Sequence, residues 1–324
     1  MSSPGSSASR GLLVAVLALA VPLALVAGLV VWWNGGIGTL VGRERCTVES
    51  PDGSVELDAE QVQHAATIAA VAHTDGLPVR AVTVGLATAM QESKLYNLPE
   101  GDHDSAGLFQ QRPSQGWGSF DQVTDPVYAS QAFFSALLQV EQWEQLPVTK
   151  AAQAVQRSAY PDAYAQHAED AKVLAAALTG RRGAALTCTV RAEDERPQDL
   201  GDTGLTPRAA KLRTAMETEW GTQSLGGFAP GGVTRPNPSA HNEGRAIDVF
   251  FEPYQQASAR HDGWAMAHWL VANADALDVS IVIYRDKIWS ARRSPEGWRD
   301  YVSPFGDPKD PTQRHMDHIH VEVP

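Results

Sequence analysis

The sequence SAHNEGRAID, residues 239–248, and the sequence DHIHVEV, residues 317–323, decide how the C-terminal part of this chain is expected to fold. The second stretch alternates polar with aliphatic side chains. Successive side chains of a strand point to opposite faces, so His318, His320 and Glu322 are expected on one face and the aliphatic side chains on the other. The aliphatic face would pack, and the histidine face would carry chemistry.

The residues around these stretches have a mixed helix and strand texture. Thr206 can cap a helix that has Pro207 in its first turn, and a second helix is expected around Gly263 to Leu277. Short β-like runs alternate with Gly- and Pro-rich loops. These runs are residues 246–251, 279–284, 287–290 and 318–323. The pattern predicts an α+β domain over residues 206–324.

Two histidines and one aspartate in these stretches form a common set of zinc ligands. We expect His241, Asp248 and His320 to bind the metal and to leave its fourth position for water or substrate. Two neutral imidazoles and one carboxylate leave such a site net positive, which lowers the pKa of the water towards 7. His318 is expected to position or deprotonate this water, with Asp317 as the competing general base. The alternatives are a metal-free fold with internally bonded histidines, and a bound metal without catalysis.

Residues 239–248 resemble the signature Ser-x-His-x-x-Gly-x-Ala-x-Asp of the zinc peptidases that include D-alanyl-D-alanine carboxypeptidases and phage peptidoglycan endopeptidases. All fixed positions match, and the resemblance covers roughly residues 225–324. It implies that His241 and Asp248 are ligands and that His320 is the late ligand histidine. The implied cofactor is zinc, and the implied substrate is a peptide bond in the stem peptides of peptidoglycan.

The resemblance leaves the general base open. Many members place Glu three residues before the last ligand, where this chain has the shorter Asp317. Other branches use a His-x-His pair, which His318 and His320 reproduce. Arg235, just upstream of the signature, is a candidate for binding a substrate carboxylate, although a solvated arginine is the simpler interpretation. Carboxypeptidase and endopeptidase activity both remain open.

The preceding domain, residues 46–188, is expected to be all-α. Its Ala-, Leu- and Gln-rich segments carry apolar residues at helical spacing, and no strand is predicted there. The expected helical segments are residues 65–72, 79–93, 126–144 and 148–178. An acidic stretch with Pro and Gly, residues 189–205, is expected to link the two domains.

Residues 65–178 resemble the lysozyme-like lytic transglycosylases, in which Glu-Ser is followed by a Gly-Leu-Met-Gln type motif and then by an Ala-rich helix with a Tyr. The corresponding sequences here are AMQES at 89–93, SAGLFQQ at 105–111 and AVQRSAYPDAY at 154–164. The resemblance implies cleavage of glycan strands.

Glu92 is the expected general acid for that cleavage. A helix C-terminus and apolar neighbours both disfavour a carboxylate, so the pKa of Glu92 should be raised and the proton available to a leaving oxygen. Transglycosylases need no second carboxylate, because the sugar's own hydroxyl attacks. Gln110, Gln111 and Tyr160 are expected to bind substrate. Alternatively, the glutamines only fix the loop, Tyr160 is a core residue, and Glu92 is an exposed or degenerate position.

The N-terminal region predicts a membrane anchor. Residues 11–33 contain no charge and would reach roughly 35 Å as a helix, against about 30 Å of bilayer core. A cleaved signal peptide is the alternative. With an anchor, residues 1–10 form a cytoplasmic tail, residues 34–45 form a stalk, and the chain is a single-pass cell-membrane protein with both domains on the extracytoplasmic side.

Cys46 and Cys188 are the chain's two cysteines and bracket the helical domain. A disulfide between them would stabilise the fold by about 4 to 5 kcal/mol on the loop-entropy model and would persist in an oxidising compartment. Two free thiols are the alternative.

Composition and motifs together favour a cell-wall enzyme. A net charge of -12 argues against a nucleic-acid partner. The first hypothesis is a bifunctional peptidoglycan-remodelling enzyme that cuts glycan strands with one domain and stem peptides with the other. A non-catalytic or half-active wall-binding scaffold is the second. A metal carrier, suggested by the 10 histidines, is the weakest. The expected partners are peptidoglycan and the membrane; no protein partner is predicted.

Overall fold

The structure, a computed structural model, describes residues 44–324 except 52, 194–196, 237 and 305–308. Residues Glu44–Pro324 form one compact unit. The predicted anchor, residues 11–33, lies outside the described residues, as do the predicted tail and nearly all of the stalk. No helix in the described part of the chain is long and apolar enough to cross a membrane. This finding contradicts the expected single-pass membrane protein.

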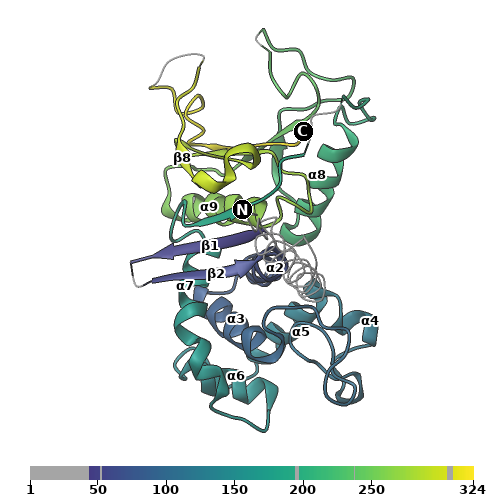
Figure 1. Cartoon of the computed structure of the whole chain (residues 1–324), viewed down its shortest axis with the longest axis vertical. Helices are drawn as coiled ribbons and strands as arrows, with labels where there is room; N and C mark the ends of the chain where they lie inside the picture. Colours follow the sequence, from purple (N-terminus) through teal and green to yellow (C-terminus); the bar gives the residue numbers. More distant parts are fainter. Residues whose placement is uncertain (1–43, 52, 194–196, 237, 305–308) are drawn as a thin grey trace, which may run out of the picture. The chain divides into compact units, whose positions relative to one another are not determined.

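The N-terminal half is built on helices. Residues 65–72 and 79–93 are helical as predicted, whereas the helix expected over residues 126–144 ends at Leu137 and the one expected over residues 148–178 is interrupted after Gln156. The first, α2, starts with a capping box in which the side chains of Asp58 and Gln61 bond each other's backbone amides. Helix α3 contacts α7 and α6, while α2 contacts α5 (Figure 1). The helices are α2 (Ala59–Thr74), α3 (Val79–Ser93), α4 (Phe120–Val123), α5 (Pro126–Leu137), α6 (Val148–Gln156) and α7 (Ala168–Leu178), with 3-10 turns η2 (Pro113–Gln115) and η3 (Ala163–His167).

This half is not all-α, because a three-stranded antiparallel sheet closes it. Strands β1 (Arg45–Ser50), β2 (Gly53–Asp58) and β3 (Leu186–Thr189) pair in the order β2-β1-β3. Cys46 lies directly opposite Cys188 in the register of β1 and β3, and the predicted disulfide joins them across 142 residues of sequence. The strands are short and β3 is distant in sequence from its partner β1, so local periodicity could not predict the three-stranded sheet.

The C-terminal half contains a six-stranded antiparallel sheet in the order β4-β5-β9-β6-β7-β8. The strands expected at the two motifs are present as β5 and β9, which are neighbours at the centre of the sheet. The elements are α8 (Pro207–Trp220), β4 (Ser224–Gly226), β5 (Ala246–Phe250), α9 (Ala257–Ala272), β6 (Ile281–Tyr284), β7 (Lys287–Ser290), η4 (Ala291–Glu296), β8 (Arg299–Asp300) and β9 (His318–Glu322).

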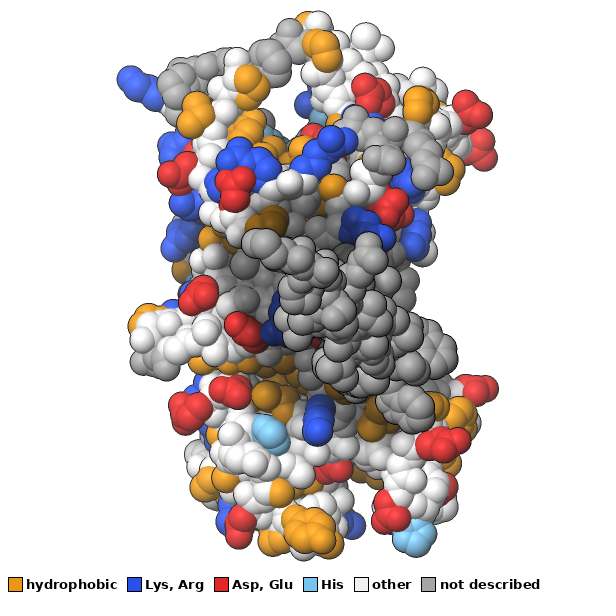
Figure 2. Space-filling model, viewed as in Figure 1, with side chains coloured by type: hydrophobic (Ala, Val, Ile, Leu, Met, Phe, Trp, Pro, Cys, Tyr) orange, Lys and Arg blue, Asp and Glu red, His pale blue; other side chains and the backbone are white. Residues whose placement is uncertain are grey.

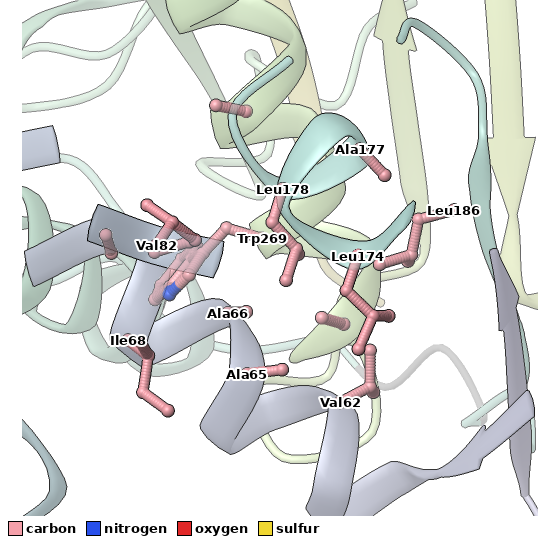
Figure 3. Packing of buried hydrophobic residues seen from close by; sticks show 14 of the residues in the cluster. Val62, Ala65, Ala66, Ile68, Val82, Leu174, Ala177, Leu178, Leu186 and Trp269 are labelled. Atoms are coloured by element: carbon pink, nitrogen blue, oxygen red, sulfur yellow. The ribbon is translucent and has the colours of Figure 1, made fainter. Parts of the chain in front are cut away.

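Helix α9 joins the two halves through one continuous core. Ten of its 16 residues are buried, as expected for a helix covered on more than one side. It contacts α2, α7 and β3 of the N-terminal half as well as β6 and β9. Figure 3 shows its Trp269 among the apolar side chains of α2, α3 and α7. The residues on both sides of the predicted linker therefore share one hydrophobic core.

A partly buried polar contact also crosses between the halves. Glu219 of α8 accepts hydrogen bonds from Thr67 of α2 and from the indole of Trp269, both at 2.9 Å.

On the face shown in Figure 2, acidic and basic side chains are interspersed, so the net negative charge of the chain is not gathered into one patch there.

Candidate functional site

Two neighbouring strands and one turn bring the three predicted metal ligands together. In the register of β5 and β9, Asp248 lies opposite His320. His241 comes from the turn that precedes β5, which is held by backbone bonds from Asn242 to Ser239 and from Gly244 to His241. All three ligand side chains are buried. Because antiparallel pairing places opposite residues on the same face, the strand register itself aligns the carboxylate with the imidazole.

The three ligand atoms form a nearly equilateral triangle. His241 Nε2 lies 3.1 Å from His320 Nδ1 and 3.2 Å from Asp248 Oδ1, and His320 Nδ1 lies 3.0 Å from Asp248 Oδ1. A tetrahedral metal with ligand distances of about 2.0–2.1 Å places its ligand atoms roughly 3.3 Å apart. The group therefore fits a small tetrahedral cation, and these residues could hold a metal ion.

The charges around the triangle favour a charged Asp248 and an oriented His320. Burial raises the pKa of Asp248, but hydrogen bonds from His241 and His320 outweigh it and hold that pKa well below its usual range. Burial lowers the pKa of His320, whereas Asp248 and Glu322 raise it more, to about 9. His320 Nε2 lies 2.8 Å from Glu322 Oε1, which leaves Nδ1 to face the triangle. A carboxylate behind a ligating histidine in this way fixes its tautomer and ring orientation.

The two competing bases, Asp317 and His318, form one pair. His318 Nδ1 lies 2.8 Å from Asp317 Oδ1, and His318 Nε2 lies 3.8 Å from Asp248 Oδ1. Thr312 donates a second hydrogen bond to Asp317 at 2.9 Å. Burial raises the pKa of Asp317, but these hydrogen bonds lower it further than burial raises it. Asp317 therefore orients the imidazole, and His318 Nε2 is the basic atom that faces the ligand triangle.

A cavity of about 650 Å³ opens beside the triangle. Arg235 lines it, with Nη2 3.5 Å from Asp248 Oδ2. The Asn242 side chain accepts from the Arg235 backbone N–H at 2.8 Å and donates to its carbonyl at 3.2 Å. The backbone of Arg235 is thereby fixed relative to the adjacent ligand His241.

Three residues of this site were not predicted from the sequence. Glu322 lies on the face that the alternation of residues 318–323 predicts, but the alternation does not show its contact with His320. His315 lines the cavity, with its ring centroid 4.8 Å from that of His318, and burial followed by the neighbouring histidines lowers its pKa to about 3. Gly227 adopts φ +84°, and a Cβ there would lie 2.5 Å from His241 Nδ1. That nitrogen is buried without a hydrogen-bond partner among the described residues.

Glu92 lies in a second and larger cleft of about 1110 Å³. It stands near the C-terminal end of α3 and is half-buried. Burial raises its pKa, and hydrogen bonds from Tyr164 and Gln156 only partly offset that effect. The hydroxyl of the buried Tyr164 donates to Glu92 Oε1 at 2.6 Å. An acid held in this way keeps its proton at higher pH than an exposed glutamate.

Of the three residues predicted to bind substrate, Gln110 and Tyr160 line this cleft and Gln111 does not. Gln110 lines the cleft, although its amide also donates to Gly107 O at 3.1 Å. Tyr160 lines it with 76% of its surface exposed. Gln111 is buried and donates to Ala129 O, so it fixes the loop, as in the alternative interpretation.

Comparison with known proteins adds one match. Residues 201–316 are similar to the family described as VldE, C-terminal domain. The matched segment contains Arg235, His241 and Asp248 and ends four residues before His320. No curated protein matches the chain. The fold and the site thus define a protein of mixed helices and strands with a buried His/Asp group that could hold a metal ion.

Proposed function

We propose that the chain is a zinc-dependent hydrolase of peptide bonds in the stem peptides of peptidoglycan. The observation that carries this proposal is the triangle of ligand atoms, with edges of 3.0 to 3.2 Å, beside an open cavity. Two imidazoles and one carboxylate are a common catalytic zinc set. The resemblance of residues 239–248 to the zinc peptidases supplies the substrate class.

The residues around the triangle have separate roles in this reaction. Zinc in this site would supply a water of lowered pKa and polarise the peptide carbonyl. His318 Nε2 accepts the proton of the attacking water, and the Asp317 carboxylate stabilises the imidazolium that results. His318 then donates this proton to the leaving amine. Arg235, fixed by Asn242, binds a negatively charged oxygen of the substrate.

A ligand variant tests the peptidase. In the full chain, His241→Ala should lose bound zinc and stem-peptide cleavage together, measured by metal analysis and by mass spectrometry of digested peptidoglycan. His103→Ala is the control, because His103 is an exposed histidine outside the site. If the zinc-loaded parent protein leaves the stem peptides intact, the chain is a scaffold and the peptidase proposal is wrong.

The second proposed activity is glycan cleavage at Glu92, which would make the protein a bifunctional peptidoglycan-remodelling enzyme. It is favoured by a half-buried carboxyl of raised pKa inside a cleft of about 1110 Å³. Glu92 donates its proton to the glycosidic oxygen, and Tyr164 holds the carboxyl in place.

Glu92→Gln should abolish the release of shortened glycan fragments and leave stem-peptide cleavage unchanged. Glu100→Gln, an exposed position outside the lining of the cleft, is the matched control. Anhydro sugar ends in the fragments of the parent protein would indicate a transglycosylase, and reducing ends a hydrolase. Glycan cleavage that survives in Glu92→Gln would contradict the assignment.

A further inference from the structure

An arginine ends helix α6 where glycine is the usual residue. Arg157 is the C-cap and adopts the left-handed conformation, with φ 52° and ψ 38°. Glycine, or sometimes asparagine, is favoured at such helix ends because a Cβ is strained there. The backbone therefore gains nothing from arginine at this position.

Hydrogen bonds order the backbone of the loop that begins at Arg157. The Arg157 N–H donates to Gln153 O at 2.8 Å, and the Gln153 amide donates to Ser158 O at 3.0 Å. The Ser158 hydroxyl in turn accepts from the Tyr160 N–H at 3.1 Å. Arg157, Ser158 and Tyr160 all line the Glu92 cleft. A bound substrate would meet a loop that is already ordered.

Arg157 is the unmatched cation of the Glu92 cleft. Two arginines line this cleft among the residues that the structure describes, and the guanidinium of the other, Arg112, is paired with Asp104 at 2.9 Å. The exposed side chain of Arg157 forms no hydrogen bond or ion pair with any described residue. In a chain of net charge -12, a free cation inside a cleft attracts an anionic ligand that the whole protein would otherwise repel.

Arg157 follows directly after a hydrogen-bond partner of the reacting carboxyl. Gln156, the preceding residue, hydrogen-bonds the carboxyl of Glu92 and also donates to Phe109 O at 2.7 Å. Consecutive Cα atoms are about 3.8 Å apart, so Arg157 begins one residue away from a partner of the acid. Arg157 and Glu92 line the same cleft, so one bound glycan strand can contact both residues.

We propose that Arg157 is a specificity-determining residue that binds a carboxylate carried by the glycan next to the cleaved bond. A guanidinium matches a carboxylate through two parallel hydrogen bonds, which a neutral sugar cannot offer. The cleft therefore selects anionic over neutral glycan strands. This inference rests on the proposed glycan-cleaving function of Glu92.

Binding measurements on the inactive Glu92→Gln chain test the proposal without relying on activity. Three probes of equal length are needed: a neutral chitin oligosaccharide, a peptidoglycan strand without stem peptides, and the same strand with them. The second probe presents free carboxylates on its sugars, whereas the third presents them only on its peptides. Arg157→Gly in this background should weaken binding of one anionic probe about tenfold and leave chitin binding unchanged. The affected probe identifies the source of the carboxylate.

The variants Arg157→Lys and Lys94→Gly, together with the thermal stability of Arg157→Gly, separate the effect of the charge from an effect on loop structure. Arg157→Gly should keep or raise the thermal midpoint, because glycine relieves the left-handed strain, and Arg157→Lys should restore part of the binding. Lys94→Gly is the matched control: Lys94 is an exposed cation at the left-handed C-cap of α3 and does not line the cleft. It should bind all three probes as the Glu92→Gln chain does.

The outcomes distinguish this proposal from the function on which it rests. If Glu92→Gln binds none of the three probes, the glycan-cleaving function and the role of Arg157 both fall. If it binds all of them and Arg157→Gly changes nothing, only the role of Arg157 falls. An equal loss for chitin and the anionic strands would also overturn the role of Arg157, because it would indicate a change of loop shape.

Discussion

Gly227 shows how closely the backbone approaches the metal-ligand group. A methyl group at this position would overlap the His241 ring, whose Nδ1 would lie 2.5 Å away. Gly227→Ala should therefore displace His241 and weaken metal binding roughly 10-fold or more, by analogy with the loss of groups that orient ligands. Competition with a chelator measures this affinity.

Gly231→Ala is the control for Gly227→Ala. Gly231 has nearly the same left-handed conformation, φ +82°, but nothing lies within 4 Å of a Cβ built on it. Both variants carry the strain of a side chain at positive φ, about 1 kcal/mol. Only in Gly227→Ala does the added methyl group contact a metal ligand, His241. Equal metal affinity in the two variants would show that the close approach of Gly227 does not shape the site.

At the scale of the elements, the sequence could predict what is local in the chain. His241 and Asp248 are seven residues apart in one motif, and the alternation of residues 318–323 identifies the strand that carries His320. The pairing of β1 with β3 and the approach of Gly227 to His241 arise only in three dimensions. His315 carries no pattern of its own, because its backbone is placed by hydrogen bonds to a turn 30 residues earlier.

The disulfide between β1 and β3 is expected to stabilise the three-stranded sheet by constraining the unfolded chain. On the loop-entropy model, closing a loop of 142 residues contributes about 4 to 5 kcal/mol. Replacing both cysteines, Cys46→Ser and Cys188→Ser, should lower the free energy of unfolding by about that amount, measured by urea titration. Adding a reductant should lower the parent protein's stability and leave that of the double variant unchanged. Equal free energies of unfolding for the oxidised parent protein and the double variant would contradict the prediction.

At the scale of the whole molecule, a fully buried histidine lies where the two halves meet. His268 of α9 donates through Nδ1 to Ala177 O at 2.8 Å and accepts through Nε2 from the Ala185 N–H at 3.2 Å. Both partners belong to the N-terminal half. This arrangement requires a neutral ring, because a protonated Nε2 would face another donor. Burial accordingly lowers the pKa of His268 to about 4.

The stability of the joined halves should therefore depend on pH through His268. The unfolded chain takes up this proton near pH 6.5, but the folded chain does so only near pH 4. The contribution is complete above pH 6.5 and is lost as the pH falls towards 4, by roughly 3 kcal/mol in all. Urea titrations should show that the free energy of unfolding falls more between pH 7 and pH 5 in the parent protein than in His268→Gln. Comparing the two proteins cancels the pH dependence of the titratable groups that they share.

Because one core joins the halves, tryptophan fluorescence and metal release should report a single unfolding transition at each pH. Separate transitions, or the same pH dependence in both proteins, would show that His268 does not couple the halves.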